Sequence, residues 1–316
     1  MKCRRCSHLA VIDLPRHNAA FCSDCLIHLV HTQVEKAIHH FKMIDEGQKV
    51  LVAVSGGKDS LALWAILDHL GFQTEGVYLG LGIEDYSDEA EEVVRAFATT
   101  RNLTLHVTRL TDTFGFDIPT AAAKTRRSPC GSCGLSKRHI LNSEALRLGS
   151  DVIATGHNLD DEAAVLFGNV MRWETEYFAR QFPVLPASPG FAKKVKPLVR
   201  LTEREMAAYC IVAGIDYQES ECPMSAGNRH LRLKAILNEI EHDAPGSKYV
   251  FVQQFFDRVH PAFADESAKD DLMTCQQCGT PTTSERCAFC RLTERVADPT
   301  LITKEIEVNI GASTDA

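Results

Sequence analysis

The middle of the chain alternates between mostly apolar runs and segments with the spacing of amphipathic helices. Continuous apolar runs are typical of strands buried on both faces of a parallel sheet. Residues 49–54 form such a run, and further strands are predicted at 75–81, 103–110 and 151–156. Helical segments separate or follow them, at residues 59–70, 89–100, 135–148 and 160–171. Strands separated by helices need right-handed crossovers, so the pattern predicts an α/β fold with a doubly wound parallel sheet.

The two ends of the chain do not continue this alternation. A connecting helix is predicted over residues 30–43 and a helical stretch over 229–258. The chain should therefore divide into five segments. They are an N-terminal zinc finger at residues 1–30, a catalytic domain at 31–225, a helical extension at 226–271, a C-terminal zinc finger at 272–295 and a flexible tail at 296–316.

Composition and charge narrow the range of partners. With 316 residues and 45% hydrophobic content, the chain can bury one substantial core plus small appendages. Its net charge of −8 disfavours a general nucleic-acid binder. Lysine and arginine nevertheless gather at residues 124–147, 193–204 and 229–234. A solvated helix face explains any one of these stretches, but three of them around the same cysteines favour a polyanionic substrate.

The N-terminal sequence and the lengths of the apolar runs indicate the cellular compartment in which the protein is expected. The chain opens with MKCRRCSHLA, which has no apolar signal-peptide region. No run approaches the roughly 20 apolar residues that span a bilayer. We expect a cytoplasmic protein with reduced thiols and no membrane association.

Twelve cysteines form the most specific pattern of the chain. Each end carries two CxxC pairs, and a CxxC turn lets two thiolates bind one metal ion from the same side. Disulfides are the alternative, but they persist in oxidising compartments. Two structural zinc sites are therefore predicted. Their ligands are Cys3, Cys6, Cys22 and Cys25 in the first and Cys275, Cys278, Cys287 and Cys290 in the second.

A third, incomplete set of cysteines lies in the middle of the chain. It consists of Cys130 and Cys133 in a further CxxC and Cys222 far downstream. Thiols at a helix N-terminus near lysine and arginine are expected to have a lowered pKa. Three thiolates suit an iron–sulfur cluster with one open iron; a buried structural trio and a dithiol pair carrying a persulfide are the alternatives. Cys210 has apolar neighbours and is predicted to be a core residue.

The first strand leads directly into Ser55-Gly56-Gly57-Lys58-Asp59-Ser60, which opens a helix. The glycines let the backbone approach an anion, and the helix N-terminus offers free N–H groups and a positive dipole. The spacing excludes a Walker A loop. Asp59 would be repelled by phosphates unless Mg²⁺ bridges them, so it is predicted to contact a metal–phosphate complex.

The fourth strand ends in the sequence TGHNLDDE. Gly156 again permits close approach of backbone to a ligand. Asp160 and Asp161 stand at a helix start, where they could cap the helix or hold Mg²⁺; we expect Asp160 to be the cap. His157 is expected to pack or cap unless it takes part in catalysis.

These motifs, in this order, resemble one family. The loop SGGKDS resembles the PP-loop of ATP pyrophosphatases, and GHNLDDEA resembles the second nucleotide motif of PP-loop tRNA-modifying enzymes. Together with PCGSCGLSKR, ECP and the terminal CxxC pairs, they resemble the tRNA 2-thiouridine synthetases over residues 1–295. The closer branch thiolates 5-methyluridine at position 54 of the T-loop, and the wobble-uridine enzymes, which act at position 34, share nearly all of the pattern.

The resemblance implies a set of cofactors, partners and site residues. It implies a [4Fe–4S] cluster on the three central cysteines, ATP with Mg²⁺ in the PP-loop and two Zn²⁺ ions. It also implies a tRNA substrate, a homodimer and a ubiquitin-like sulfur-carrier protein with a C-terminal thiocarboxylate. The catalytic residues would be Asp59, Lys137 and Asp161. The nucleotide-binding residues would be Ala53, Val54, Ser55, Gly56, Gly57, Lys58, Asp59, Ser60, Leu79, Lys137, Gly156 and Asp161.

The chemistry can also be argued from the residues. The C2 carbonyl oxygen of uracil is a poor leaving group, and adenylation by ATP turns it into a phosphate ester that sulfide can displace. Lys58 and Lys137 would neutralise the developing phosphate charge. Lys137 lies one helical turn from Cys133, so it can link cluster and nucleotide. A PP-loop ligase that uses ammonia or lysine and a non-catalytic RNA-binding zinc protein are the alternatives.

Overall fold

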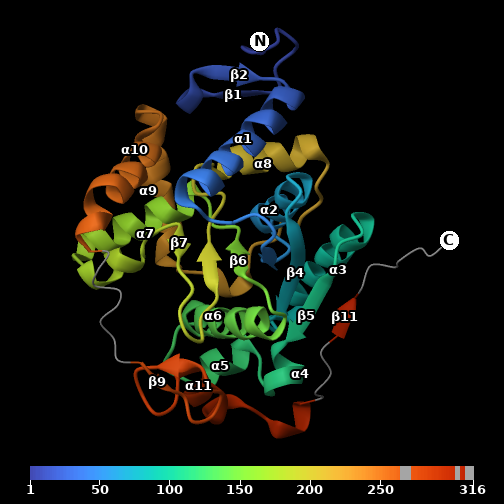
Figure 1. Ribbon diagram of the computed structural model, residues 1–316, viewed down its shortest axis with the longest axis vertical. Helices are drawn as coiled ribbons and strands as arrows, with labels where there is room; N and C mark the ends of the chain where they lie inside the picture. The colour runs from blue at the N-terminus through green and yellow to red at the C-terminus, as the bar shows by residue number, and fades with distance from the viewer. Residues whose placement is uncertain (264–271, 303–306, 310–316) are drawn as a thin grey trace, which may run out of the picture.

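The computed structural model describes residues 1–263, 272–302 and 307–309. Within these residues a seven-stranded sheet forms the centre of the molecule, in the order β11-β5-β4-β3-β6-β8-β7 (Figure 1). The five inner strands are parallel, and the two edge strands run antiparallel to their neighbours. The bounds are β3 Lys49–Val54, β4 Gln73–Gly80, β5 Leu105–Arg109, β6 Val152–Thr155, β7 Val184–Leu185, β8 Lys193–Val195 and β11 Glu307–Asn309. The predicted doubly wound parallel sheet is confirmed.

Helices cover both faces of the sheet, and the alternation of side chains along each strand explains why. Val50 and Val52 of β3 face one hydrophobic core, whereas Leu51 between them faces the other. The first core contains residues of α1 Ser23–Phe41, α2 Lys58–His69, α3 Glu84–Thr100, α7 Leu159–Arg172, α8 Glu203–Ala213 and α10 Ser247–Gln254. The second contains residues of α5 Ile118–Lys124, α6 Pro129–Arg147 and α11 Ala288–Val296.

Several predicted boundaries are wrong. The helix predicted from residue 135 is α6, which already begins at Pro129, because the Ser128 hydroxyl accepts a hydrogen bond from Gly131 N–H at 3.1 Å. The helical stretch predicted over 229–258 divides into α9 Arg229–Asp243, α10 and a π-helical turn at Phe255–Val259. Five shorter elements were not predicted, because they are too short for their periodicity to be recognised in the sequence. They are α4 Leu110–Phe114, α5, α8, β7 and β8.

Two parts of the C-terminal tail, which is predicted to be flexible, have an assigned structure. Residues Pro299–Leu301 form a 3₁₀ turn, and Glu307–Asn309 form strand β11, which pairs with β5 and covers that edge of the sheet. The other tail positions, 303–306 and 310–316, lie outside the described residues, as do 264–271 of the predicted helical extension.

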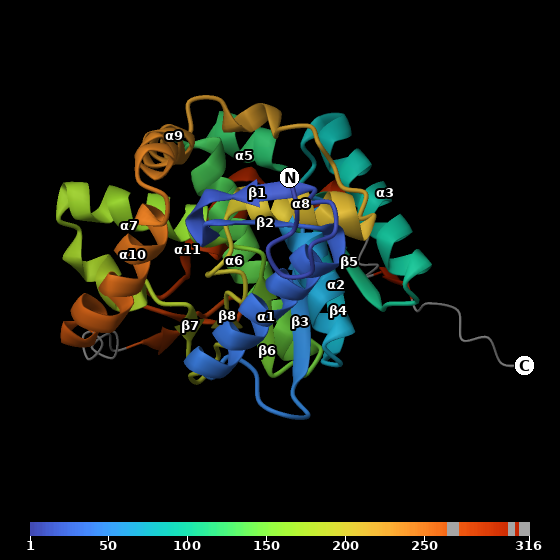
Figure 2. The ribbon, with the colours of Figure 1, turned by 90° about the horizontal axis from the view of Figure 1, so that it is seen from above.

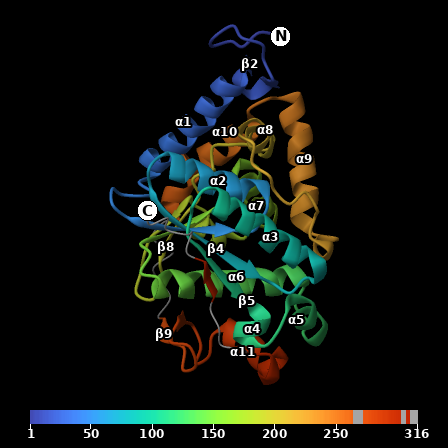
Figure 3. The ribbon, with the colours of Figure 1, turned by 90° about the vertical axis from the view of Figure 1, so that its right-hand side faces the viewer.

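The two cysteine-rich modules lie at opposite ends of the long axis (Figure 1, Figure 3). The N-terminal module contains the hairpin of β1 Ile12–Leu14 and β2 Ala19–Phe21, which lies over α8 (Figure 2). The C-terminal module contains β9 Met273–Thr274, β10 Pro281–Thr282 and α11. Its Phe289 side chain stacks on the His139 ring of α6, with ring centroids 4.2 Å apart. The second module therefore packs directly on the helix that carries Cys130 and Cys133.

A buried ion-pair cluster attaches the N-terminal module to the catalytic domain. Arg16 Nη2 lies 2.8 Å from both carboxylate oxygens of Glu205, and His17 Nε2 lies 2.6 Å from Oε1. Glu205 is 1% exposed and also accepts a hydrogen bond from Thr202 N–H, which caps α8. Because the carboxylate is buried, its partners are needed to keep it charged in the interior.

Acid is expected to weaken this attachment. Burial raises the pKa of Glu205, but the hydrogen bond to His17 and the charge of Arg16 outweigh it, so the pKa lies below the ordinary glutamate value. Such a carboxylate stabilises the fold above its unfolded pKa of about 4.3, and this contribution is lost as the pH falls through the folded pKa. Glu205→Gln should therefore lower the unfolding midpoint at pH 7, and should lower it by much less at a pH below the folded pKa, which itself lies under about 4.3. An equal difference between the two proteins at both pH values would contradict this assignment.

No helix within the described residues is both long enough and apolar enough to cross a lipid bilayer.

Candidate functional site

The PP-loop connects the end of β3 to the start of α2. Gly56 has φ +82°, a backbone conformation that residues other than glycine rarely adopt, and a β-carbon there would lie only 3.1 Å from Ala90. Both the backbone conformation and the lack of room for a side chain therefore require glycine. The Ser60 hydroxyl accepts a hydrogen bond from Ser55 N–H at 3.1 Å and donates one to Gly57 O at 2.9 Å. The loop is therefore already folded around the N-terminus of α2, where free N–H groups favour an anion.

The second predicted nucleotide motif lies against this loop. A β-carbon on Gly156, just after β6, would lie 2.9 Å from Ser60 N, so the two loops meet backbone to backbone. The strand order reverses between β3 and β6, since β4 and β5 lie on one side of β3 and β6 on the other. Ligands of open α/β sheets bind at this switch point, beyond the carboxyl ends of the strands. The predicted contacts Ala53, Val54 and Leu79 lie near the same ends of β3 and β4.

The start of α7 differs from the prediction. Asn158, not Asp160, is the N-cap, and Asn158 and Asp161 form a reciprocal capping box with distances of 3.0 and 3.1 Å. Asp160 points into the protein, where it is paired with Lys248 of α10 and accepts a hydrogen bond from Glu203 N–H at 2.8 Å. The cap prediction is wrong because the asparagine two residues earlier takes that role.

Five charged side chains form a network of ion pairs beside the PP-loop. They are Lys58, Asp59, Asp161, Glu203 and Lys234. Lys58 Nζ lies 3.3 Å from Asp59 Oδ2 and 2.8 Å from Glu203 Oε1. Lys234 Nζ of α9 lies 2.6 Å from Asp161 Oδ1 and 3.4 Å from Glu203 Oε2. Neither Glu203 nor Lys234 is a predicted site residue; Lys234 belongs only to the basic stretch at residues 229–234.

The two aspartates predicted to contact metal and phosphate are close in space. Burial raises the pKa of Asp59 to about 6; Lys58 opposes this, and the negative charge of Asp161 adds to it. Asp59 Oδ1 is buried and forms no well-aligned hydrogen bond among the described residues, although the Asn158 side chain adjoins the carboxylate and favours its charged form. A buried carboxylate oxygen without a well-aligned hydrogen bond, beside a second carboxylate, is what a divalent cation would satisfy.

The three central cysteines also come together. Cys130 and Cys133 lie in the first two turns of α6, and the segment after Cys222 lies over them, with Met224 O 3.9 Å from Cys130 Sγ. The predicted lowering of the thiol pKa is wrong for Cys133. Burial raises its pKa; Lys137 opposes this, but the charges of Cys222 and Cys130 add to the increase.

The spacing of the central thiols differs from that of the terminal modules. Among the described residues, the groups whose ligand atoms all lie within 4.8 Å of one another are the two terminal cysteine tetrads. Cys130, Cys133 and Cys222 do not form such a group, although their charges act on one another.

Lys137 lies near both the central cysteines and the nucleotide motif at the end of β6. Its charge opposes the raised pKa of Cys133 and acts on His157, whose pKa is lowered chiefly by burial. His157 Nδ1 lies 2.9 Å from the Thr155 hydroxyl, so this ring is held at the end of β6. The role of Lys137 as a link between the thiols and the nucleotide motif stays a prediction.

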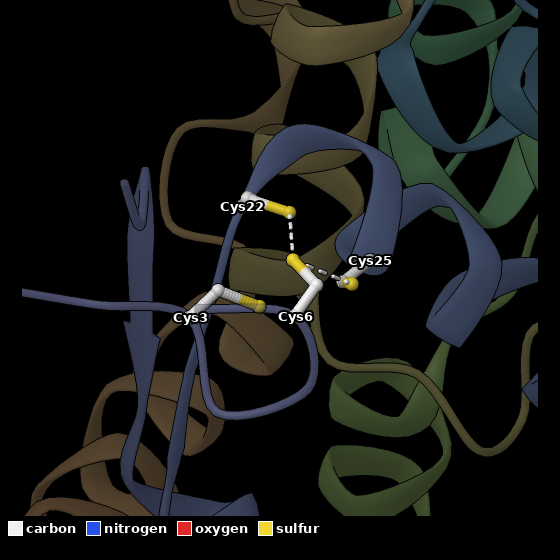
Figure 4. A group of neighbouring side chains, drawn as sticks. All are labelled: Cys3, Cys6, Cys22 and Cys25. Atoms are coloured by element: carbon white, nitrogen blue, oxygen red, sulfur yellow. Dashed lines mark hydrogen bonds between the residues drawn. The ribbon is translucent and has the colours of Figure 1, made fainter. Parts of the chain in front are cut away.

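Each terminal module brings its four cysteine sulfurs together. In the N-terminal module Cys6 Sγ lies 3.4 Å from Cys22 Sγ and 3.6 Å from Cys25 Sγ (Figure 4). In the C-terminal module the corresponding distances are 3.7 Å for Cys278–Cys287 and 3.9 Å for Cys275–Cys290. Four thiolates around one Zn²⁺, with Zn–S of about 2.3 Å, would lie roughly 3.8 Å apart. Both tetrads therefore have the geometry of a tetrahedral metal site.

Cys210 belongs to the core, as predicted, but it also supports the site. It is fully buried, and burial raises the pKa of its thiol to about 12. Its Sγ lies 3.5 Å from the carbonyl oxygen of Lys58, directly beneath the first residue of α2. The thiol therefore stays protonated and packs under the PP-loop.

Fold and site together define a PP-loop α/β enzyme in which a nucleotide site and an open set of three thiols share one edge of the sheet. Comparison with known proteins agrees. The PP-loop domain family matches residues 30–234. The family described as "2-thiouridine synthetase TtuA, N-terminal LIM domain" matches residues 2–27.

Whole-chain relatives specify the family further. The chain is 44% identical over 296 residues to the tRNA-5-methyluridine(54) 2-sulfurtransferase of Thermus thermophilus, covering 94% of this chain and 92% of the relative. It is 39% identical to the enzyme of that name from Pyrococcus horikoshii, with coverages of 92% and 93%. The chain therefore belongs to the family of the tRNA-5-methyluridine(54) 2-sulfurtransferases, which are PP-loop enzymes.

A solved structure shows the same fold. It is described as the U34-tRNA thiolase NcsA from Methanococcus maripaludis with its [4Fe-4S] cluster, and it is similar to this chain with a TM-score of 0.79 at 24% identity. The alignment covers 94% of this chain and 97% of that one, so the likeness includes both terminal modules and the sheet.

Proposed function

We propose that this protein replaces the C2 oxygen of 5-methyluridine 54 in tRNA by sulfur, with consumption of ATP. The observation that carries the proposal is that the PP-loop, Lys137 and the three central cysteines lie at one site. The family assignment supports the tRNA substrate and the target base. Two steps are needed: activation of the carbonyl oxygen and replacement of that oxygen by sulfide.

The first step uses the PP-loop. The C2 oxygen attacks the α-phosphate of ATP, pyrophosphate leaves, and the oxygen becomes part of an adenylate ester. The backbone N–H groups of the loop and Lys58 hold the phosphates, where they stabilise developing negative charge. Asp59 and Asp161 would hold Mg²⁺, which the buried Oδ1 of Asp59, without a well-aligned hydrogen bond among the described residues, fits. Mg²⁺ would neutralise phosphate charge and orient the leaving group.

The second step uses the central thiols. Sulfide attacks C2, the bond between C2 and the adenylate oxygen breaks, and AMP carries that oxygen away. Cys130, Cys133 and Cys222 would hold a [4Fe–4S] cluster, whose open iron would supply a binding position for sulfide. Lys137 would then neutralise the phosphate of the departing AMP, because it lies between the thiols and the nucleotide motif.

The terminal tetrads would each hold one Zn²⁺. In each module one thiol, Cys3 or Cys275, has its pKa lowered to about 6: burial acts against this, and backbone N–H groups that donate to the sulfur outweigh it. Such donors favour the thiolate form that zinc requires. The family resemblance further suggests a homodimer and a ubiquitin-like sulfur-carrier protein with a C-terminal thiocarboxylate as the sulfur donor.

Release of AMP and pyrophosphate from ATP tests the first step. The protein should release both in equal amounts when unmodified tRNA and sulfide are present, and little when tRNA is omitted. Equal release without tRNA would contradict a mechanism in which the tRNA base is the nucleophile.

Lys137→Ala is expected to lower thiolation by about a hundredfold or more, because a positioned charge at a departing phosphate contributes several kcal/mol. Iron content should stay unchanged, since the lysine binds no metal. Arg138→Ala, the exposed neighbour on α6, is the matched control and should retain most activity. Full thiolation by Lys137→Ala with an intact cluster would refute the assigned role.

A further inference from the structure

An acidic side chain joins two lysines where phosphate should bind. Glu203 Oε1 lies 2.8 Å from Lys58 Nζ, in the PP-loop, and Oε2 lies 3.4 Å from Lys234 Nζ, in α9. Both lysine side chains are 20% exposed. One carboxylate therefore bridges two half-buried ammonium groups that come from opposite sides of the site.

The Glu203 side chain is not needed to build its own helix. Thr202 and Glu205 form the capping box of α8, and the Glu203 backbone N–H, not its carboxylate, contacts Asp160. The Glu203 side chain is 40% exposed, and ion pairs at that exposure contribute little to stability. A carboxylate in the first turn of α8 stabilises that helix by only about 0.3–1 kcal/mol, whereas at a phosphate site it would repel the ligand.

Among the described residues, the ion-pair partners of Lys234 are two acidic side chains. Lys234 is paired with Asp161 at 2.6 Å as well as with Glu203. A pyrophosphate group carries more negative charge than one carboxylate and has more oxygens to accept from two ammonium groups.

We infer that Lys234 binds the pyrophosphate part of ATP together with Lys58, and that the Glu203 carboxylate competes with phosphate for both lysines. When the triphosphate enters, both lysines exchange Glu203 for phosphate oxygens. Lys234 also leaves Asp161, whose carboxylate becomes available to the metal ion. The α9 helix, which belongs to the extension after the catalytic domain, thereby contributes directly to the nucleotide site.

This inference rests on the proposed use of ATP but not on the transfer of sulfur. It is tested by calorimetric titration of the full chain with Mg²⁺-ATP, Mg²⁺-pyrophosphate and AMP, without tRNA or sulfide. Lys234→Ala should weaken binding of ATP and pyrophosphate by about tenfold to a hundredfold, as expected for loss of a charged hydrogen bond. AMP, which lacks the groups that Lys234 contacts, should bind as to the wild type.

Two further variants separate a binding role from a structural one. Lys234→Arg keeps the charge and should restore most of the affinity for pyrophosphate. Arg232→Ala removes an exposed charge from the same helix and should leave all three affinities unchanged within about twofold. Equal weakening of ATP and AMP binding by Lys234→Ala, or loss of affinity in Lys234→Arg, would overturn the inference.

Glu203→Gln tests the second half of the inference. If the carboxylate competes with phosphate, its neutral isostere should bind pyrophosphate several-fold more tightly than the wild type. If Glu203 instead holds the metal ion, the same change should weaken binding, which would contradict the inference. The proposed function fails separately: wild-type protein that binds ATP with these dependences, yet forms no thiolated base, would refute sulfur transfer and leave the phosphate site intact.

Discussion

Replacing Cys222 by serine is expected to abolish tRNA thiolation, by about 1,000-fold or more, while ATP binding persists. The site has three thiols, and a serine oxygen is a poor ligand for the iron of an iron–sulfur cluster. Cys222 lies in a loop outside the PP-loop, and the segment that follows it lies over α6, where Met224 O is 3.9 Å from Cys130 Sγ. The PP-loop, which is folded by its own hydrogen bonds, should therefore remain intact.

Three measurements on anaerobically purified protein check this expectation: iron content, thiolation and ATP affinity. Cys210→Ala is the matched control, because it removes the one cysteine outside the three sets. It should keep its iron, although the cavity left under Lys58 should lower the unfolding midpoint. Undiminished product formation by Cys222→Ser would instead favour a PP-loop ligase that needs no thiol.

Lys248→Met is expected to cause the largest loss of stability among single changes outside the metal sites. Lys248 and Asp160 are 4% and 3% exposed, and they form an ion pair between α10 and the start of α7. Removing the lysine leaves a buried carboxylate without its cation, which costs about 3–5 kcal/mol. The unfolding midpoint should fall by on the order of 10 °C. Because Asp161 adjoins Asp160, affinity for ATP should fall as well.

The double variant Lys248→Met/Asp160→Leu is the control for this prediction. It removes both charges and replaces them by apolar side chains of similar size, so much of the lost stability should return. A double variant as unstable as Lys248→Met would show that packing, not the unpaired charge, causes the loss. Differential scanning fluorimetry of the three proteins at one protein concentration is sufficient.

The local parts of the site could be predicted from sequence. The PP-loop depends on a strand, two glycines and a helix start within a dozen residues, and the structure forms them as expected. The terminal tetrads were predictable for the same reason, since each CxxC turn sets two ligands by itself.

The long-range parts could not be predicted. Three ion pairs at the site join residues that are far apart in sequence: Lys234–Asp161, Lys58–Glu203 and Lys248–Asp160. They form because α8, α9 and α10 fold back on the start of α7. No local sequence pattern indicates this folding back. The error at Asp160 has a different cause. Asn158, Asp160 and Asp161 are all good capping residues, and only the folded backbone decides which one caps. The raised pKa of Cys133 likewise depends on burial that sequence does not give.

The central claim is that this chain thiolates position 54 of tRNA, and the most direct measurement locates the sulfur. Anaerobic protein with its iron intact is incubated with ATP, sulfide and tRNA that carries 5-methyluridine 54 but no thiolated base. Nuclease fragments of the tRNA are then analysed by mass spectrometry. The account predicts a gain of sulfur for oxygen in the T-loop fragment containing position 54, dependent on ATP. Sulfur in the anticodon fragment at position 34, or no thiolated fragment, would contradict it.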